Sequence, residues 1–223
     1  MMIELKNIVK SYSSEKVLKG ISLNIEDGDF VAIMGESGSG KSTLLSILGG
    51  FLSADEGTVM WSGKDISALS DDEMSELRCT KIGFVFQSYR LIPTLNVKDN
   101  LLLTANLGRK LDDDTLKYAE KLIDTLKLSN TLSRYPDEIS GGQAQRVAIA
   151  RALVYKPEIV ILDEPTGALD SEMKKVVMEL LSTVNKDLGT TIIQVTHSST
   201  VASYASKTIL LKDGEIFTQG DKK

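Results

Sequence analysis

The segment from Gly35 to Thr43 combines the residue types and spacing that bind phosphate groups. It fits the pattern G-x-x-x-x-G-K-[ST], with Lys41 and Ser42 at the last two places. Glycines let successive backbone N–H groups point into one concavity, the following helix adds unpaired amides, and the lysine adds a full positive charge. We therefore predict a polyphosphate site at which the Ser42 hydroxyl is a ligand of Mg²⁺. The predicted loop residues are Gly35, Glu36, Ser37, Gly38, Ser39, Gly40, Lys41, Ser42 and Thr43.

A pair of carboxylates, Asp163 and Glu164, directly follows the apolar run 159–162. At the end of a buried strand, Asp163 could hold Mg²⁺ directly or through water. Glu164 beside it could accept a proton from a water that attacks the γ-phosphate. The alternative is a turn-forming Asp-Glu pair ahead of Pro165. The phosphate loop upstream favours the catalytic interpretation.

A second predicted helix start carries two glycines in the sequence Ser140-Gly141-Gly142-Gln143. Ser140 and Gln143 have the spacing of a capping box, and the glycines between them leave the helix amides uncovered. This arrangement predicts a second anion site. Taken in isolation, the same residues are also compatible with a well-capped helix and nothing more.

The elements that must position these residues alternate between strands and helices, and most of the strands are apolar throughout. This order predicts an α/β fold with a P-loop NTPase core, in which helices cover both faces of a mainly parallel sheet. Segments that alternate apolar and polar residues predict an additional antiparallel layer. In the antiparallel layer we expect strands 3–9 and 17–25 and, within 57–64, a strand followed by a turn. The parallel sheet should contain strands 30–34, 82–86, 159–162, 190–195 and, as the last, 208–211. Expected helices follow the phosphate loop, begin at the Ser70 capping box and at Ser140, and cover 115–126 and 171–188.

We expect a single domain over residues 1–223. Residues 1–87 and 157–223 would form the catalytic core with its antiparallel layer. Residues 88–156 have helical periodicity and would form a helical subdomain.

The composition argues against several classes of protein. The formal net charge is −5 and Lys/Arg residues are not interleaved with aromatic residues, so nucleic acid is not an expected partner. Cys79 is the only cysteine, which excludes an internal disulfide and favours a reducing compartment. Since no apolar run has the length of a signal or membrane-spanning segment, we expect a cytoplasmic protein.

From Ile3 to Gly220, the chain resembles the nucleotide-binding subunit of ATP-binding-cassette (ABC) transporters. The most specific segment is 139–146, Ile-Ser-Gly-Gly-Gln-Ala-Gln-Arg, which is similar to that family's signature sequence. Ala144 stands there in place of a polar residue, and Ser198 stands where the family often has Asp. Neither departure removes a group expected to carry chemistry.

The resemblance implies ATP and Mg²⁺ as ligands and assigns a role to further residues. Tyr12 would stack on adenine, and Gln87 would contact both Mg²⁺ and the attacking water. Asp170 would anchor a loop that crosses a dimer, and His197, the only histidine, would contact the γ-phosphate. The expected catalytic residues are thus Glu164, His197, Gln87 and Lys41, with Ser42, Gln87 and Asp163 as metal ligands. Each of these residues also has an alternative without a chemical role. Tyr12 could be a tyrosine at a strand edge, Gln87 a polar strand end, Asp170 an ordinary helix cap and His197 a structural histidine.

The resemblance also implies partners. Two cassettes would pair head to tail when ATP is bound, so that Ser140, Gly141, Gly142 and Gln143 of one chain meet the nucleotide of the other. The ATPase would drive separate integral-membrane permease subunits at the inner face of the membrane, docking near Gln87 and segment 88–107 with Tyr89, Leu91, Ile92 and Pro93. Within the family, the chain resembles the branch for lipoprotein release, macrolide export and antimicrobial-peptide resistance. A non-transport cassette ATPase and a cell-division ATPase that signals through a permease-like partner stay open as alternatives.

Overall fold

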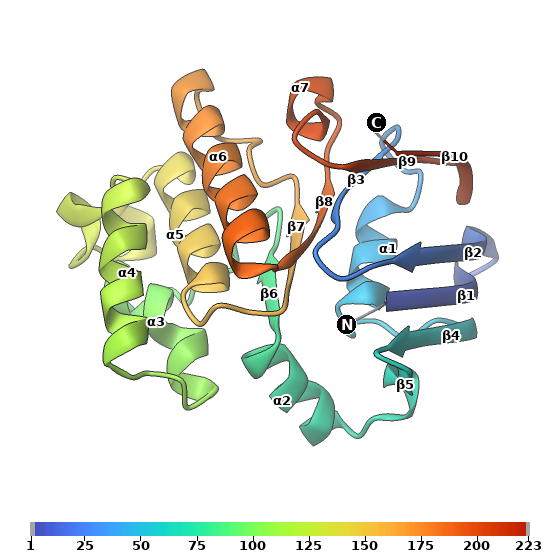
Figure 1. Cartoon of the computed structure of the whole chain (residues 1–223), viewed down its shortest axis with the longest axis horizontal. Helices are drawn as coiled ribbons and strands as arrows, with labels where there is room; N and C mark the ends of the chain where they lie inside the picture. The colour runs from blue at the N-terminus through green and yellow to red at the C-terminus, as the bar shows by residue number, and fades with distance from the viewer. Residues whose placement is uncertain (1–2, 222–223) are drawn as a thin grey trace.

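The computed structural model describes the backbone of residues 3–221, and its centre is a six-stranded sheet (Figure 1). The strands of this sheet are β3 Phe30–Met34, β6 Ile82–Val85, β7 Ile159–Asp163, β8 Thr191–Val195, β9 Lys207–Lys212 and β10 Glu215–Asp221. They lie in the order β10-β9-β3-β8-β7-β6, and only β10 pairs in the antiparallel direction. The predicted mainly parallel sheet is confirmed.

A second, four-stranded sheet is antiparallel and has the order β2-β1-β4-β5. Its strands are β1 Ile3–Tyr12, β2 Glu15–Ile25, β4 Glu56–Trp61 and β5 Lys64–Asp65. The alternation of buried and exposed residues along β2 is the pattern expected for a layer with one face covered. This sheet is the antiparallel layer predicted from the sequence.

Most of the helices lie on the side of the six-stranded sheet that faces away from the antiparallel layer (Figure 1). Residues 88–156 form helices and no strand. Among residues 3–221, no helix is both long enough and apolar enough to cross a membrane. The α-helices are α1 Lys41–Leu48, α2 Asp71–Thr80, α3 Val97–Leu107, α4 Asp113–Thr125, α5 Gly141–Leu153, α6 Ser171–Leu188 and α7 Ser199–Ala202, and short 3₁₀ turns span Ile66–Ala68, Ser129–Thr131 and Pro136–Glu138.

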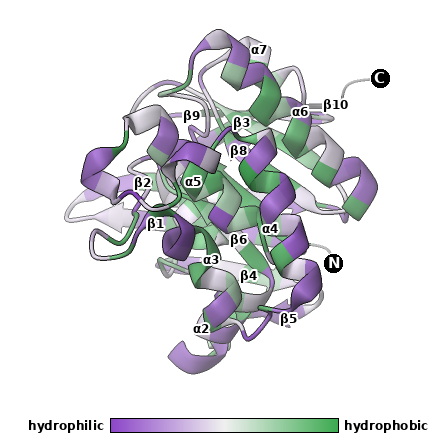
Figure 2. Ribbon diagram, turned by 90° about the vertical axis from the view of Figure 1, so that its left-hand side faces the viewer, coloured by the Kyte–Doolittle hydropathy of each residue, from purple (hydrophilic) through white to green (hydrophobic). Residues whose placement is uncertain are grey.

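Both faces of the parallel sheet are buried, because successive side chains of a strand point to opposite faces. In β3, Val31 and Ile33 pack with α1 and the antiparallel layer. Phe30 and Ala32 pack with α3, α5 and α6 on the other face. The hydrophobic residues accordingly gather around the strands at the centre, while hydrophilic residues lie along the outer turns of α4 and α6 (Figure 2). The two cores hold the carboxyl ends of the strands in fixed positions.

The end of the chain differs from the prediction, because the strand that begins near Thr208 is not the last one. Strand β10 folds back on β9 through a two-residue turn at Asp213 and Gly214, which have φ angles of 49° and 81°. Asp-Gly is a favoured pair for a hairpin turn with two positive φ angles. The sequence therefore carried a signal for this hairpin, and the expectation of 208–211 as the last strand was wrong.

Tyr155 fixes the end of α5 to the strand that leads into Gln87. Its ring is buried, and its hydroxyl donates a hydrogen bond to the Ile82 carbonyl. Burial raises the pKa of Tyr155, so the hydroxyl stays a donor throughout the accessible pH range. We expect Tyr155→Phe to lower the free energy of unfolding by about 1–3 kcal/mol, since a buried carbonyl loses its partner. Urea unfolding measures this change, and an unchanged midpoint would contradict it.

Candidate active site

A cleft of about 820 Å³ opens at the carboxyl ends of β3, β7 and β8, where the loops to the next helices begin. In open α/β sheets this edge is the usual place for a ligand. The cleft combines loops from distant parts of the chain. Its lining residues are Tyr12, Val17, Gly35, Ser37, Gly38, Gly40, Lys41, Ser42, Thr43, Gln87, Tyr89, Gln145, Asp163, Glu164, Gly167, Ala168, Val195 and His197.

The loop between β3 and α1 has the backbone that its glycines predict. Gly38 and Gly40 have φ angles of 83° and 99°, which disfavour residues with a side chain. Gly40 precedes α1 without a side-chain cap, so the first amides of this helix have no side-chain partner. The Lys41 ammonium lies over the loop and donates to the carbonyls of Gly35 and Glu36 at 2.9 and 2.6 Å. Amides and ammonium together form a nest for an anion.

Within the same loop, Ser39 is buried and its hydroxyl has no hydrogen-bond partner among the described residues. Glu36 contributes its backbone carbonyl to Lys41. Neither side chain lines the cleft.

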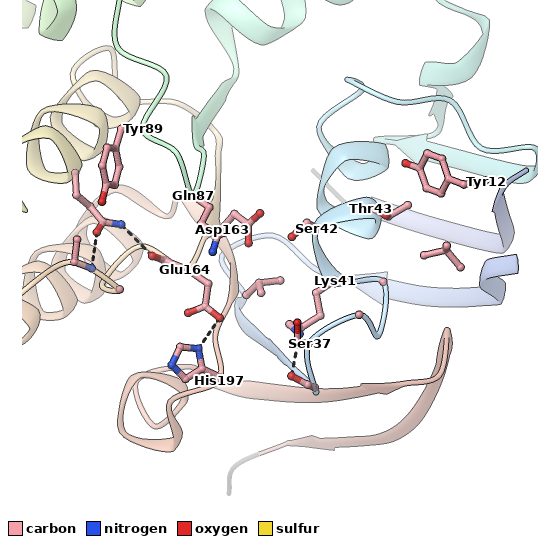
Figure 3. A pocket seen from close by; sticks show the side chains of 18 residues that line it. Tyr12, Ser37, Lys41, Ser42, Thr43, Gln87, Tyr89, Asp163, Glu164 and His197 are labelled. Carbon is pink, nitrogen blue, oxygen red and sulfur yellow. Dashed lines mark hydrogen bonds and ion pairs between the residues drawn. The ribbon is translucent and has the colours of Figure 1, made fainter. Parts of the chain in front are cut away.

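Asp163 ends β7 and faces the start of α1, close to Ser42 (Figure 3). Burial raises the pKa of its carboxyl, while a hydrogen bond from Ser42 and the charge of Lys41 act in the opposite direction. Gln87 follows β6 and lines the cleft nearby. Among residues 3–221 no cluster of three or more His, Cys, Asp or Glu side chains could hold a metal by itself. A hydroxyl, one carboxylate and an amide oxygen nevertheless suit Mg²⁺, which is usually held by few protein ligands together with substrate phosphates.

Glu164 follows Asp163 and turns its carboxylate toward His197 (Figure 3). The Oε1 atom lies 2.9 Å from Nδ1 of His197. The Glu164 side chain is 16% exposed and that of His197 is 76% exposed, so the carboxylate is sheltered while the imidazole faces solvent. Glu164 has a φ angle of 51°, in the left-handed region that is costly for a residue with a side chain.

Tyr12 lies on the rim of the cleft at the end of β1, beyond Thr43 as seen from Asp163 (Figure 3). Its side chain is on the surface, with 51% of the residue exposed. An exposed ring at the mouth of an anion nest can stack on a flat group. The geometry therefore places an aromatic surface at one side of the nest and a carboxylate at the other.

The predicted residues of the second helix start do not line this cleft. Ser140 caps α5 in a capping box: its hydroxyl accepts from the Gln143 amide at 3.3 Å, and Gln143 Oε1 accepts from the Ser140 amide at 2.8 Å. Gly141 and Gly142 follow as the first residues of the helix. Asp170 likewise lies outside the cleft lining and caps α6 by accepting from the Met173 amide at 2.9 Å. Within a single chain, only one of the two glycine-bearing helix starts thus lines the cleft.

Sequence reasoning did not assign Gln145, Val17 or Val195 to the cleft, yet the structure brings all three to its wall. Val17 and Val195 are apolar strand residues of a kind that recurs throughout the chain. Gln145 lies on α5, and its position two residues after Gln143 gave no sign of a contact with the loop that follows β7. Gln145 is 1% exposed, whereas the neighbouring polar residues Gln143 and Arg146 are only half-buried.

The fold and the cleft define a P-loop nucleotide-binding protein. The family model described as "ABC transporter" matches residues 18–167. The chain belongs to the ABC transporter family, as its signature-like segment suggested, and it has the fold of an ABC ATPase.

The chain is also similar to curated proteins of antibiotic export systems. A macrolide export ATP-binding/permease protein MacB from Pasteurella multocida is 46% identical over 219 residues, which are 96% of this chain and 34% of the relative. The bacitracin export ATP-binding protein BceA from Halalkalibacterium halodurans is 41% identical over 225 residues, 98% of this chain and 88% of that protein. The chain thus spans about a third of the length of the macrolide export relatives that it matches.

Solved structures agree with this assignment over the whole chain. The ATP-binding cassette MJ0796, in a dimeric post-hydrolysis state bound to ADP and Pi, superposes with a TM-score of 0.93 at 40% identity and covers 99% of both chains. A second dimeric structure of MJ0796, described as a bacterial ABC transporter cassette, gives a TM-score of 0.94 at 41% identity. The chain is accordingly an ATP-binding protein that hydrolyses ATP.

Proposed function

We propose that this ATPase works as a head-to-tail homodimer that closes around ATP and powers a separate membrane permease for export. The observation that carries the proposal is that only one of the two glycine-bearing helix starts lines the cleft. Gly40 opens α1 inside the cleft, whereas Ser140 opens α5 outside it. A second copy is the partner that can bring Ser140 to the nucleotide. The dimeric structures of MJ0796 support such an assembly.

The chemistry follows from the groups in the cleft. The nest and Lys41 would bind the β- and γ-phosphates, and Tyr12 would stack on the base. Glu164 would accept the proton of the attacking water, with His197 holding the carboxylate through the 2.9 Å contact. Gln87 would orient that water from the end of β6. These steps need a sheltered carboxylate opposite the phosphate loop, which the cleft provides.

Mg²⁺ would be held by Ser42, Asp163 and Gln87 together with phosphate oxygens. When bound, it neutralises charge that develops on the transferred phosphoryl group. Because burial raises the pKa of Asp163, this carboxyl would lose its proton, and become able to hold the metal, at a higher pH than an exposed aspartate does.

The permease would dock beside Gln87, on segment 88–107 with Tyr89, Leu91, Ile92 and Pro93, and on the nearby rings of Phe51 and Phe86. Phe51 and Ile92 are 44% and 40% exposed, and the rings of Phe51 and Phe86 lie 5.2 Å apart. Arg90 lies over the Phe86 ring at 3.9 Å. Phe86 is half-buried, and aromatic residues together with an arginine are typical of the centre of a protein interface. The names of the relatives, which refer to macrolide export and bacitracin export, favour an antibiotic or peptide as cargo. Docking to a permease would place the chain at the inner face of the membrane.

A test of the dimer uses Ser140→Arg in a chain that also carries Glu164→Gln, which slows hydrolysis. We expect this chain to bind ATP but to stay monomeric, because the larger side chain blocks the helix start that meets the partner's nucleotide. The dimerisation constant should weaken by at least about 100-fold, or about 2.7 kcal/mol. Analytical ultracentrifugation with and without Mg-ATP measures it.

Ser70→Arg is the matched control, because Ser70 caps α2 in the same kind of capping box and lies outside the cleft. Both substitutions remove a helix cap worth about 1 kcal/mol. The control should dimerise normally. Normal ATP-dependent dimerisation of the Ser140→Arg chain would contradict the head-to-tail arrangement.

A further inference from the structure

We infer that Gln145 is a positioning residue for hydrolysis: its side-chain amide fixes the backbone of Glu164 and of the following loop. The inference rests on the proposed role of Glu164 as the group that accepts the water proton. Gln145 lies on α5, one turn after the Ser140 cap, and reaches into the wall of the cleft.

Both polar atoms of the Gln145 side-chain amide form hydrogen bonds. Its Nε2 donates to the Glu164 carbonyl at 2.9 Å, and its Oε1 accepts from the Ala168 amide at 3.1 Å. The side chain thus spans the loop from Glu164 to Ala168. Because Gln145 is 1% exposed, water does not replace these bonds easily.

The loop needs such a support because its backbone is strained. Glu164 has a φ angle of 51°, and such a conformation persists only when the surroundings enforce it. Within the loop, the Gly167 amide donates to the Glu164 carbonyl at a longer 3.2 Å. The shorter bond from Gln145 therefore anchors the peptide that sets the direction of the Glu164 side chain. A small rotation there would displace the carboxylate from His197 and from the attacking water.

A second contact shows that α5 packs closely against this loop. A Cβ atom on Gly142 would lie 3.0 Å from the Ala168 carbonyl oxygen, so the absence of a side chain lets the helix approach the loop. Gly142 and Gln145 are three residues apart and lie on the same side of the helix. The start of α5, which is proposed to meet the nucleotide of a second copy, is thereby joined to the Glu164 of its own chain.

The test is a double-mutant cycle on the full chain with Gln145→Met and Glu164→Gln, measured by steady-state ATP hydrolysis. Methionine fills the same space but makes neither hydrogen bond. We expect Gln145→Met to lower kcat about 10- to 100-fold, the size of effect that a misplaced catalytic group produces. KM for ATP and the affinity for a fluorescent ATP analogue should change less than about twofold, since the phosphate loop is untouched.

In the double mutant, kcat should match that of Glu164→Gln within about twofold, because Gln145 acts through Glu164.

Asn185→Leu is the matched control, because it also removes a side-chain amide that holds two backbone groups. Asn185 donates to the Gly28 and Thr190 carbonyls at 2.8 and 2.9 Å, at the amino ends of β3 and β8 and thus away from the cleft. This variant should lose stability but keep its kcat. If Gln145→Met does not fold, Gln145→Glu replaces it, since it keeps the acceptor for Ala168 and loses the donor to Glu164.

The possible failures can be told apart. Unchanged kcat in the folded Gln145 variant overturns the inference and leaves the role of Glu164 intact. Losses that multiply in the double mutant overturn it as well, because Gln145 would then act independently. Full hydrolysis by Glu164→Gln alone overturns both this inference and the proposed role of Glu164.

Discussion

Replacing Glu164 by Gln is expected to lower ATP turnover by about 100- to 10,000-fold, the usual contribution of a general base. The amide has the same shape as the carboxylate and can keep the contact with Nδ1 of His197, so the cleft should keep its geometry. It cannot accept the proton of the attacking water. ATP affinity should therefore stay the same, and ATP that is bound but not hydrolysed should hold the two copies together.

The measurements for Glu164→Gln are phosphate release and sedimentation in Mg-ATP. Glu158→Gln is a suitable control, because Glu158 is an exposed residue that pairs with Lys81 at 3.0 Å outside the cleft. It should hydrolyse ATP at the wild-type rate. A Glu164→Gln chain that binds ATP and stays monomeric would count against the closed dimer, even if its turnover is low.

Replacing Lys41 by Ala should weaken ATP binding by about 100-fold or more. The ammonium lies within the loop, 2.9 Å from the Gly35 carbonyl, where it can turn to the phosphates of a bound nucleotide. A hydrogen bond to a charged group contributes about 1.5–3 kcal/mol, and the lysine can provide more than one. Hydrolysis should be lost at ordinary ATP concentrations as a consequence.

Titration with a fluorescent ATP analogue measures the binding of the Lys41→Ala chain. Lys127→Ala makes the same change of charge at an exposed ion pair with Glu172 and should bind ATP normally. This comparison separates the local effect of Lys41 from the change in net charge. Undiminished binding or hydrolysis by Lys41→Ala would refute its assigned role.

Local signals in the sequence predicted much of the fold. Helix α6 spans Ser171–Leu188, the predicted range, because Asp170 caps its start and Gly189 ends it in a left-handed conformation. Both capping boxes, at Ser70 and Ser140, were predicted from the spacing of two residues and are present. Such features depend on neighbours within one helical turn, so they can be recognised without a three-dimensional structure.

Contacts between distant segments were harder to predict. Gln145 and Glu164 are 19 positions apart and meet only because α5 packs against β6, the strand that pairs with β7. The left-handed backbone of Tyr89 and Arg90 is another case: their carbonyls accept hydrogen bonds from the buried Arg151 at 2.6 and 2.8 Å. No local pattern encodes these partners. Strand β10 is different, since the Asp213-Gly214 pair of its turn is a local signal.

Helix α5 and the turn that follows it connect three separate parts of the protein: Gln145 contacts the Glu164 loop, Arg151 contacts the segment after Gln87, and Tyr155 in the turn contacts β6. One added residue turns everything beyond it by about 100° around the axis, since a turn contains 3.6 residues. Any insertion or deletion between Gln145 and Tyr155 would therefore point at least one of these side chains away from its partner. Because most of its residues are also buried, natural variants of this segment should keep its length constant.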